Sequence, residues 1–176
     1  QRFEARGKNP DAWHYHALGL RRAAALLWDR IEAANDYEEK GDWMFAVGRV
    51  AMMLEGLAVE VLIKAILVLS NPEKFVRDGR WTLRGEEGHD LLELISDAGV
   101  ALESTQEADL LARLRAFVGW AGRYPIPLKY EQWTPKAVGE HAIEIPPGTY
   151  YSTADRDKVE ALFSRLEAVL KERMEA

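Results

Sequence analysis

The 176-residue chain contains no cysteine, so it has neither disulfide bonds nor thiolate metal sites. No basic segment followed by an apolar one stands near residue 1, as it would in a secretory signal peptide. Together these absences favour a cytoplasmic location. His14 and His16 are two positions apart, so a helix would direct them to different sides. We therefore expect no metal site and no cofactor.

An excess of basic residues is also missing. The chain has 23 Lys and Arg against 29 Asp and Glu, giving a net charge of −6. This net charge argues against a strongly positive electrostatic potential over the whole surface, of the kind that attracts nucleic acids, although it allows a local basic patch. The chain also has no glycine-rich phosphate loop and no nucleophile elbow. Hydrophobic residues nevertheless make up 48% of the chain, which is enough for one domain with a substantial core.

The longest apolar run is residues 50–69, VAMMLEGLAVEVLIKAILVL, interrupted only by Glu55, Glu60 and Lys64. A helix that is apolar nearly all round belongs in an interior. The run approaches the length of a membrane span, but three ionised side chains count against one, so we expect no membrane segment. Glu60 and Lys64 are one helical turn apart and are predicted to pair. Such a pair must be satisfied by partners or lie at an internal edge.

Five segments have helical patterns of apolar residues. We expect them at about residues 11–35, 42–69, 89–98, 104–124 and from 152 onward. Residues 1–10 are predicted to be a tail or an entry turn, and residues 71–87 a loop. Residues 124–151 are predicted to be an irregular insertion rich in proline and aromatic residues, and residues 141–153 could include a short strand or hairpin. The sequence therefore predicts a single all-α domain over residues 1–176, an up-and-down bundle of four to five helices with a long loop before the last.

Three sets of residues are candidates for function, and each also has a structural interpretation. Glu60 and Lys64 form either a structural ion pair or part of a polar cluster at a cleft or dimer seam. Asp90 can cap a helix while His89 anchors the loop, or His89 can be a catalytic imidazole. Arg123 lies at a helix C-terminus, where it can cap the helix or stack on a neighbouring aromatic ring such as Trp120, or it can bind phosphate.

Two less specific features surround these candidates. The 71–87 loop carries four cations, offset by four acids; the cations are Lys74, Arg77, Arg80 and Arg84. The aromatic residues of 124–151, beginning with Tyr124, could stack on bases or pack over the bundle.

The order of these features resembles the HEPN family, whose members are helical bundles named for a nucleotide-binding role. The resemblance covers about residues 12–124: an apolar helix LAVEVLIKAILVL, a variable loop, GHDLLELISDAG, and a helix ending in WAGRYP. The A-x-E-x-x-x-K pattern common in the family is matched by Ala58, Glu60 and Lys64. The frequent His-Asp-Leu start of the next helix is matched by His89, Asp90 and Leu91.

The resemblance implies a four- or five-helix bundle that is often a homodimer. Many members are metal-independent ribonucleases of toxin–antitoxin or phage-defence systems, with an Arg followed four to six residues later by a His at the dimer cleft. Arg123 occupies the Arg position, but the residues after it, YPIPLKYEQW, contain no His, and the next imidazole is His141. Ribonuclease chemistry needs a group that transfers a proton, and Lys129 would be a poor one at the usual pKa of lysine.

We therefore expect an RNA- or nucleotide-binding or accessory protein without the standard ribonuclease motif. The residues expected to bind are Glu60, Lys64, Arg80, Arg84, Arg123 and Tyr124. The alternatives are a divergent ribonuclease that uses Arg123 with His89 or His141, and a structural protein–protein interaction module. The expected partners are a second copy of the chain, RNA or a nucleotide, or another protein.

Overall fold

The computed structural model describes residues 2–77, 80–81, 89–124 and 149–176. Its helices are α1 (Arg2–Gly7), α2 (Pro10–Glu32), α3 (Tyr37–Trp43), α4 (Arg49–Ser70), α5 (Pro72–Phe75), α6 (Leu91–Asp97), α7 (Thr105–Ala116) and α8 (Ala154–Glu175). Two π-helical turns, η1 (Met44–Gly48) and η3 (Phe117–Ala121), join α3 to α4 and extend α7. The two-residue strands β1 (Val76–Arg77) and β2 (Arg80–Trp81) pair antiparallel. The predicted all-α bundle is confirmed.

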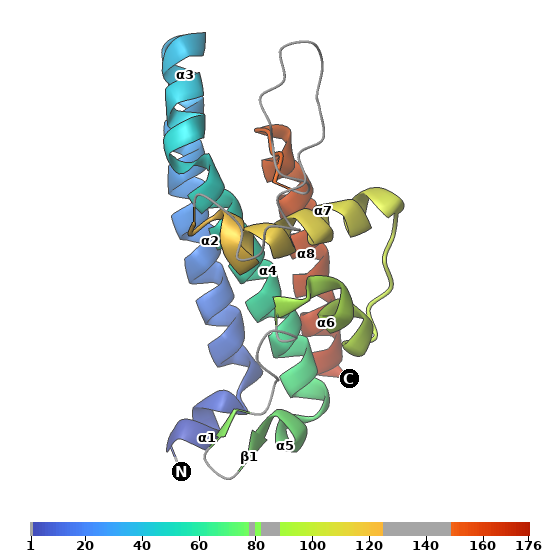
Figure 1. The fold of residues 1–176 in the computed structure, drawn as a ribbon. Helices are drawn as coiled ribbons and strands as arrows, with labels where there is room; N and C mark the ends of the chain where they lie inside the picture. The colour runs from blue at the N-terminus through green and yellow to red at the C-terminus, as the bar shows by residue number, and fades with distance from the viewer. Residues whose placement is uncertain (1, 78–79, 82–88, 125–148) are drawn as a thin grey trace.

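Three long helices, α2, α4 and α8, form the body of the bundle (Figure 1). α2 and α4 run antiparallel and share the most extensive contact in the molecule, whereas α8 runs in the same direction as α4. α7 crosses these helices, and α6 packs on both α4 and α7. α4 therefore touches α2, α6, α7 and α8, which makes it the centre of the fold.

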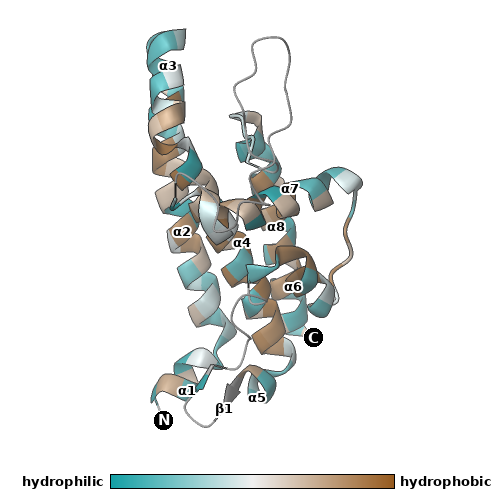
Figure 2. Ribbon diagram, viewed as in Figure 1, coloured by the Kyte–Doolittle hydropathy of each residue, from teal (hydrophilic) through white to brown (hydrophobic). Residues whose placement is uncertain are grey.

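The burial of α4 explains why residues 50–69 are apolar on nearly every side. Fourteen of its 22 residues are buried, so no face of the helix is exposed to water along its whole length. Figure 2 shows this helix largely in hydrophobic colours through its lower half, while the outer end of α3 is hydrophilic. At Gly56 a Cβ atom would lie 2.6 Å from Val118 Cγ2, so the glycine allows α4 and the η3 turn to approach closely. Among the described residues, none of the helices has the length and apolarity needed to cross a membrane.

Several predicted boundaries are confirmed by the groups that cap the helices. The hydroxyl of Ser104 accepts a hydrogen bond from the Glu107 amide, as the capping-box spacing predicted for the start of α7. Asp90 caps α6 by accepting hydrogen bonds from two backbone amides. Gly99 follows α6 with a φ of 62°, the left-handed conformation that favours glycine at a helix C-terminus.

Two predictions about the N-terminal half were wrong. Residues 2–7 form α1 instead of a tail or turn, and Asn9 then caps α2, accepting from the Asp11 amide at 3.0 Å. The second long helix was expected near Asp42, but α3 begins at Tyr37. Its start is set by Asp36, whose carboxylate accepts from the Glu39 amide at 2.8 Å. This cap outweighs the cost of about 1 kcal/mol for Gly41 inside the helix.

The predicted loops were partly wrong as well. Residues 71–87 contain α5 and the two short strands in their described part. The strand or hairpin predicted for residues 141–153 is not formed by residues 149–153, and residues 141–148 lie outside the described structure. The same is true of Arg84, His141 and most of the predicted insertion over 124–151.

Candidate functional site

A buried ion pair on α4 is the first part of the candidate site. Glu60 is 3% exposed and Lys64 is 7% exposed. The Lys64 Nζ atom donates to Glu60 Oε1 at 2.5 Å, so the predicted pairing one turn apart is confirmed. Removing two charges from water is expensive, and a pair this deep is retained only where further polar contacts compensate.

His89 supplies the further contact. Its Nδ1 atom lies 2.8 Å from Glu60 Oε2, the carboxylate oxygen that Lys64 does not bind. The His89 side chain is 50% exposed, so this chain of contacts leads from the buried lysine to the surface. Within the described part of the chain, His89 Nε2 has no hydrogen-bonding partner. The imidazole is therefore anchored at one nitrogen and open at the other.

Arg115 forms an ion pair with Asp90, the residue that follows His89. Asp90 uses its Oδ1 atom to cap α6, and its Oδ2 atom lies 2.8 Å from Arg115 Nη1 of α7 in an ion pair. The Arg115 side chain is 56% exposed, so most of its five N–H donors remain available to a ligand. We call these residues the Glu60 cluster: Glu60, Lys64, His89, Asp90 and Arg115.

The other residues predicted to bind are not joined to this cluster. Arg123 caps its own helix, donating from Nη2 to the carbonyl oxygens of Val118 and Gly119 at 3.0 and 2.6 Å. Its guanidinium lies 5.5 Å from the centre of the Tyr124 ring. The capping interpretation of Arg123 is thus confirmed, but the ring it contacts is Tyr124 and not Trp120, which faces Arg49.

No hydrogen bond or ion pair in the described structure connects Arg123 or Tyr124 to Glu60, Lys64 or His89. Arg80 is exposed on β2 and likewise has no described contact with the cluster. Sequence reasoning identified Glu60, Lys64 and His89 but missed Arg115. Its position on α7 gives no signal, because only the packing of α6 against α7 brings it to Asp90.

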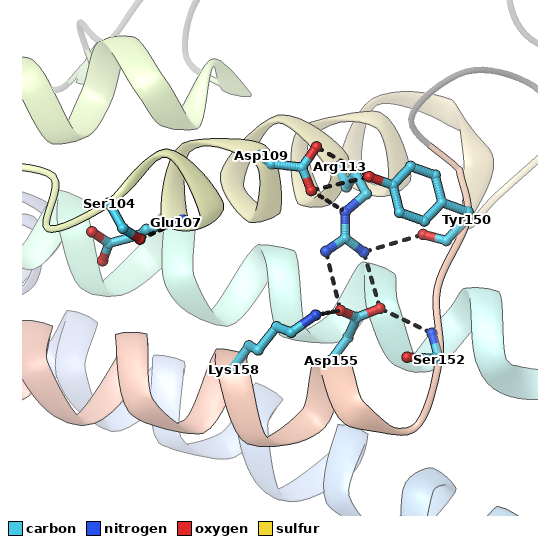
Figure 3. Close-up of polar contacts among 8 residues, drawn as sticks. All are labelled: Ser104, Glu107, Asp109, Arg113, Tyr150, Ser152, Asp155 and Lys158. Atoms are coloured by element: carbon cyan, nitrogen blue, oxygen red, sulfur yellow. Dashed lines mark hydrogen bonds and ion pairs between the residues drawn. The ribbon is translucent and has the colours of Figure 1, made fainter.

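A second polar cluster joins α7 to α8 (Figure 3). Arg113, which is buried, forms a bidentate ion pair with the buried carboxylate of Asp155, at 2.9 and 3.1 Å. The same guanidinium donates to Asp109 at 3.0 Å and lies 4.7 Å from the centre of the Tyr150 ring. We call these residues the Arg113 cluster: Asp109, Arg113, Tyr150, Asp155 and Lys158.

The charged groups of the Arg113 cluster stabilise one another in their ionised forms. Burial alone would raise the pKa of Asp155, but hydrogen bonds from Arg113, from the Ser152 amide and from Lys158 lower it overall. Burial would lower the pKa of Arg113, and its two carboxylate partners raise it instead. Both groups are therefore fixed in their ionised forms.

Two grooves lie beside the Arg113 cluster, at the N-terminus of α7. One, of about 500 Å³, is lined by residues of α7 and α8 that include Glu107 and Arg165. The other, of about 410 Å³, is lined by Asp109, Arg113 and Lys158 among others. Every charged side chain that lines the two grooves already has an ion-pair partner within the chain. The Arg113 cluster therefore has the character of a structural link between α7 and α8.

Glu55 is the third buried acid, and it is enclosed. It is 1% exposed, and Arg21 Nε lies 3.2 Å from its Oε2 atom without hydrogen-bonding alignment. Burial raises the pKa of Glu55 from its ordinary 4.5 to about 7, against the opposing effect of Arg21. In the described part of the chain, no three His, Asp or Glu side chains gather as they would around a metal ion.

No family model matches this chain, and no curated protein or solved structure is significantly similar to it. The residues of the Glu60 cluster and the resemblance of the sequence motifs are therefore what point to a function.

Proposed function

We propose that this protein is a HEPN-like helical bundle that binds RNA or a nucleotide through the Glu60 cluster. The observation that supports it is the half-exposed imidazole of His89, held by a buried ion pair, together with the exposed guanidinium of Arg115, which pairs with the following residue, Asp90. A guanidinium suits phosphate oxygens, and an imidazole with one free nitrogen suits a hydroxyl or phosphate.

The motif residues add support. The A-x-E-x-x-x-K and His-Asp-Leu patterns contribute Glu60, Lys64, His89 and Asp90; the first three form one chain of contacts, and Asp90, next to His89 in the sequence, pairs with Arg115. A bundle needs none of them for its apolar core. Because a buried ion pair is weak evidence for stability, positioning His89 is the more specific reason to retain it.

Binding is tested by titrating the full chain with a fluorescent single-stranded RNA at low salt, where phosphate contacts are strongest. We expect binding that weakens as salt is raised, and that weakens further in Arg115→Gln. The matched control is Arg123→Gln, which removes an exposed cation of another surface and is expected to leave affinity unchanged. RNA and nucleotides that fail to bind at low salt would refute the proposal.

A second candidate is a metal-independent ribonuclease, favoured by the hydrogen bond between Glu60 and His89. A carboxylate that orients an imidazole is a common arrangement for a general base. In this version His89 acts with Arg115, and Arg123 has no role. RNA cleavage in the presence of a chelator should be lost in His89→Ala and retained in Arg123→Ala; retention in His89→Ala would end this candidate.

The proposal includes a homodimer in the cytoplasm, with a role in a toxin–antitoxin or phage-defence system, as the resemblance implies.

The outer face of α2 supports the dimer. Tyr15 and Leu26 are 75% and 71% exposed, and residues 11 positions apart lie on one face of a helix. Sedimentation analysis should give twice the chain mass, and Leu26→Glu should shift it toward the monomer. A monomer at every concentration would refute the dimer but not the binding site.

A further inference from the structure

One side of the helical segment formed by α3 and the η1 turn is exposed to water, at the end of the bundle opposite the two chain termini (Figure 1). Five exposed residues fall within about 140° of the helix circumference, counting about 100° per residue. The residues between them in the sequence, 39, 40, 43 and 44, are only partly exposed. We call the five exposed residues the α3 outer face: Tyr37, Glu38, Gly41, Asp42 and Phe45.

The α3 outer face holds the two most exposed large hydrophobic side chains of the described residues. Tyr37 is 93% exposed and Phe45 is 88% exposed. Gly41 leaves a gap between them in the sequence, because a Cβ atom there would meet no other atom within 4 Å. Glycine destabilises a helix interior, and no close approach within the described chain requires it here. Two large rings on one face, separated by a gap, form a surface that another protein can cover.

Two carboxylates flank the rings and are not neutralised. Neither Glu38 nor Asp42 has an ion-pair or hydrogen-bonding partner for its side chain in the described part of the chain. On the other side of the same helix, Glu39 pairs with Arg30 at 2.8 Å. The Arg30 guanidinium also lies 4.3 Å from the centre of the Trp43 ring. The inner side of α3 is therefore satisfied within the chain, and the outer side is not.

The charge of the α3 outer face indicates the chemistry of its partner. Residues 36–42, DYEEKGD, contain four acidic side chains and one lysine. Such a surface repels phosphate groups, so it disfavours nucleic acid and anionic lipid, and it also repels a second copy of itself. A partner needs cationic groups for the carboxylates and apolar groups for the rings. A helix with both kinds of residue repeated every three or four positions matches the one-turn spacing of Glu38 and Asp42.

We propose that the α3 outer face docks a basic amphipathic helix of another protein. The apolar residues of that helix cover Tyr37 and Phe45, and its Lys or Arg residues pair with Glu38 and Asp42. None of these residues belongs to the Glu60 cluster, so this interaction is independent of the proposed function.

The test uses two fluorescent helical peptides of about 18 residues, long enough to cover the face: one of leucine and lysine, and one of leucine and glutamate. Fluorescence anisotropy with the full chain at about 0.15 M salt should detect binding of the Leu/Lys peptide and not of the Leu/Glu peptide. Tyr37→Ser and Phe45→Ser should each weaken binding by about tenfold. The control is Phe3→Ser, which removes a 56% exposed ring from α1 at the other end of the molecule and should have no effect.

A charge reversal separates docking from general attraction to an acidic protein. Glu38→Lys combined with Asp42→Lys should abolish binding of the Leu/Lys peptide and create binding of the Leu/Glu peptide. Glu172→Lys combined with Glu175→Lys changes the net charge equally at the exposed C-terminal end of α8 and should preserve the original preference. Circular dichroism checks that each variant is folded, and the charge reversal tests the proposal if a serine variant is not.

Three results would overturn the proposal. The first is failure of the natural chain to bind the Leu/Lys peptide. The second is an equal loss of binding in the two charge-reversal variants, which would assign the attraction to net charge alone. The third, seen by sedimentation analysis, is conversion of a dimer into a monomer by Tyr37→Ser or Phe45→Ser, which would identify the occupant of this face as a second copy of the chain.

Discussion

The Arg113 cluster and the Glu60 cluster both place ionised side chains inside an apolar bundle, and both involve α7. In the Arg113 cluster the buried guanidinium is held by two carboxylates and covered by an aromatic ring, so its donors are used within the chain. In the Glu60 cluster the contacts run outward, from buried Lys64 through Glu60 to a half-exposed imidazole. A closed network stabilises a contact between helices, whereas an open one leaves a polar group accessible at the surface.

The largest effect should come from breaking the closed network. Asp155→Ala leaves Arg113 buried without its main partner and should lower the free energy of unfolding by about 3 to 5 kcal/mol. Denaturant titration measures the change. Lys158→Gln is the control, since Lys158 is mostly exposed and its loss should cost less than about 1 kcal/mol. Similar costs for the two variants would show that the bidentate pair contributes little.

Breaking the open network at its buried end should cost less. Lys64→Met leaves Glu60 buried, but His89 remains as a partner, so we expect a loss of about 3 kcal/mol in the same titration. Glu60→Gln combined with Lys64→Met should recover most of that loss, because no unpaired charge remains. If the double variant is no more stable than the single one, burial of an unpaired charge is not the cause.

The enclosed acid Glu55 gives a third case, with a pH dependence of its own. Its pKa rises from 4.5 to about 7 on folding, so the folded protein binds this proton more tightly than the unfolded chain does. The stabilisation from this bound proton is fully present below pH 4.5. As the pH rises through about 7, its loss lowers the free energy of unfolding by about 2 to 3 kcal/mol. Asp155 has the opposite sign: its pKa is lowered, so its contribution is lost as pH falls.

Measuring the free energy of unfolding between pH 4.5 and 8 checks the Glu55 effect. Glu55→Gln should flatten the decline over this window and be more stable than the natural chain at pH 8. A decline of the same size in Glu55→Gln would assign the pH dependence to other groups.

The smallest effect on stability should come from the exposed end of the Glu60 cluster. His89→Phe should change the free energy of unfolding by less than about 1 kcal/mol, because the imidazole is half exposed and Lys64 still compensates Glu60. The same variant should have a marked effect on ligand binding. A stability loss as large as that of Lys64→Met would place His89 with the structural residues and remove the contrast between the two clusters.

The periodic segments of the sequence determined most of the fold. Residues 50–69 are apolar on nearly every side because other helices surround α4. This pattern is visible in the sequence without knowing which helices pack against it. The pairing of Glu60 with Lys64 was equally predictable, since four residues make one helical turn. The start of α3 was missed because Gly41 favours a break before Asp42, whereas the structure has a helix that Asp36 caps and that continues through Gly41.

Only the tertiary structure decided which polar residues meet. His89 and Glu60 are 29 positions apart, and Arg113 and Asp155 are 42 apart, so no local pattern relates them. Arg113 and Arg115 are two positions apart on one helix, yet α8 encloses the first and α6 leaves the second exposed. The sequence thus sets the helices and their apolar faces through local periodicity. Whether a charged side chain is closed into the bundle or left open depends on helix packing, which brings together residues distant along the chain.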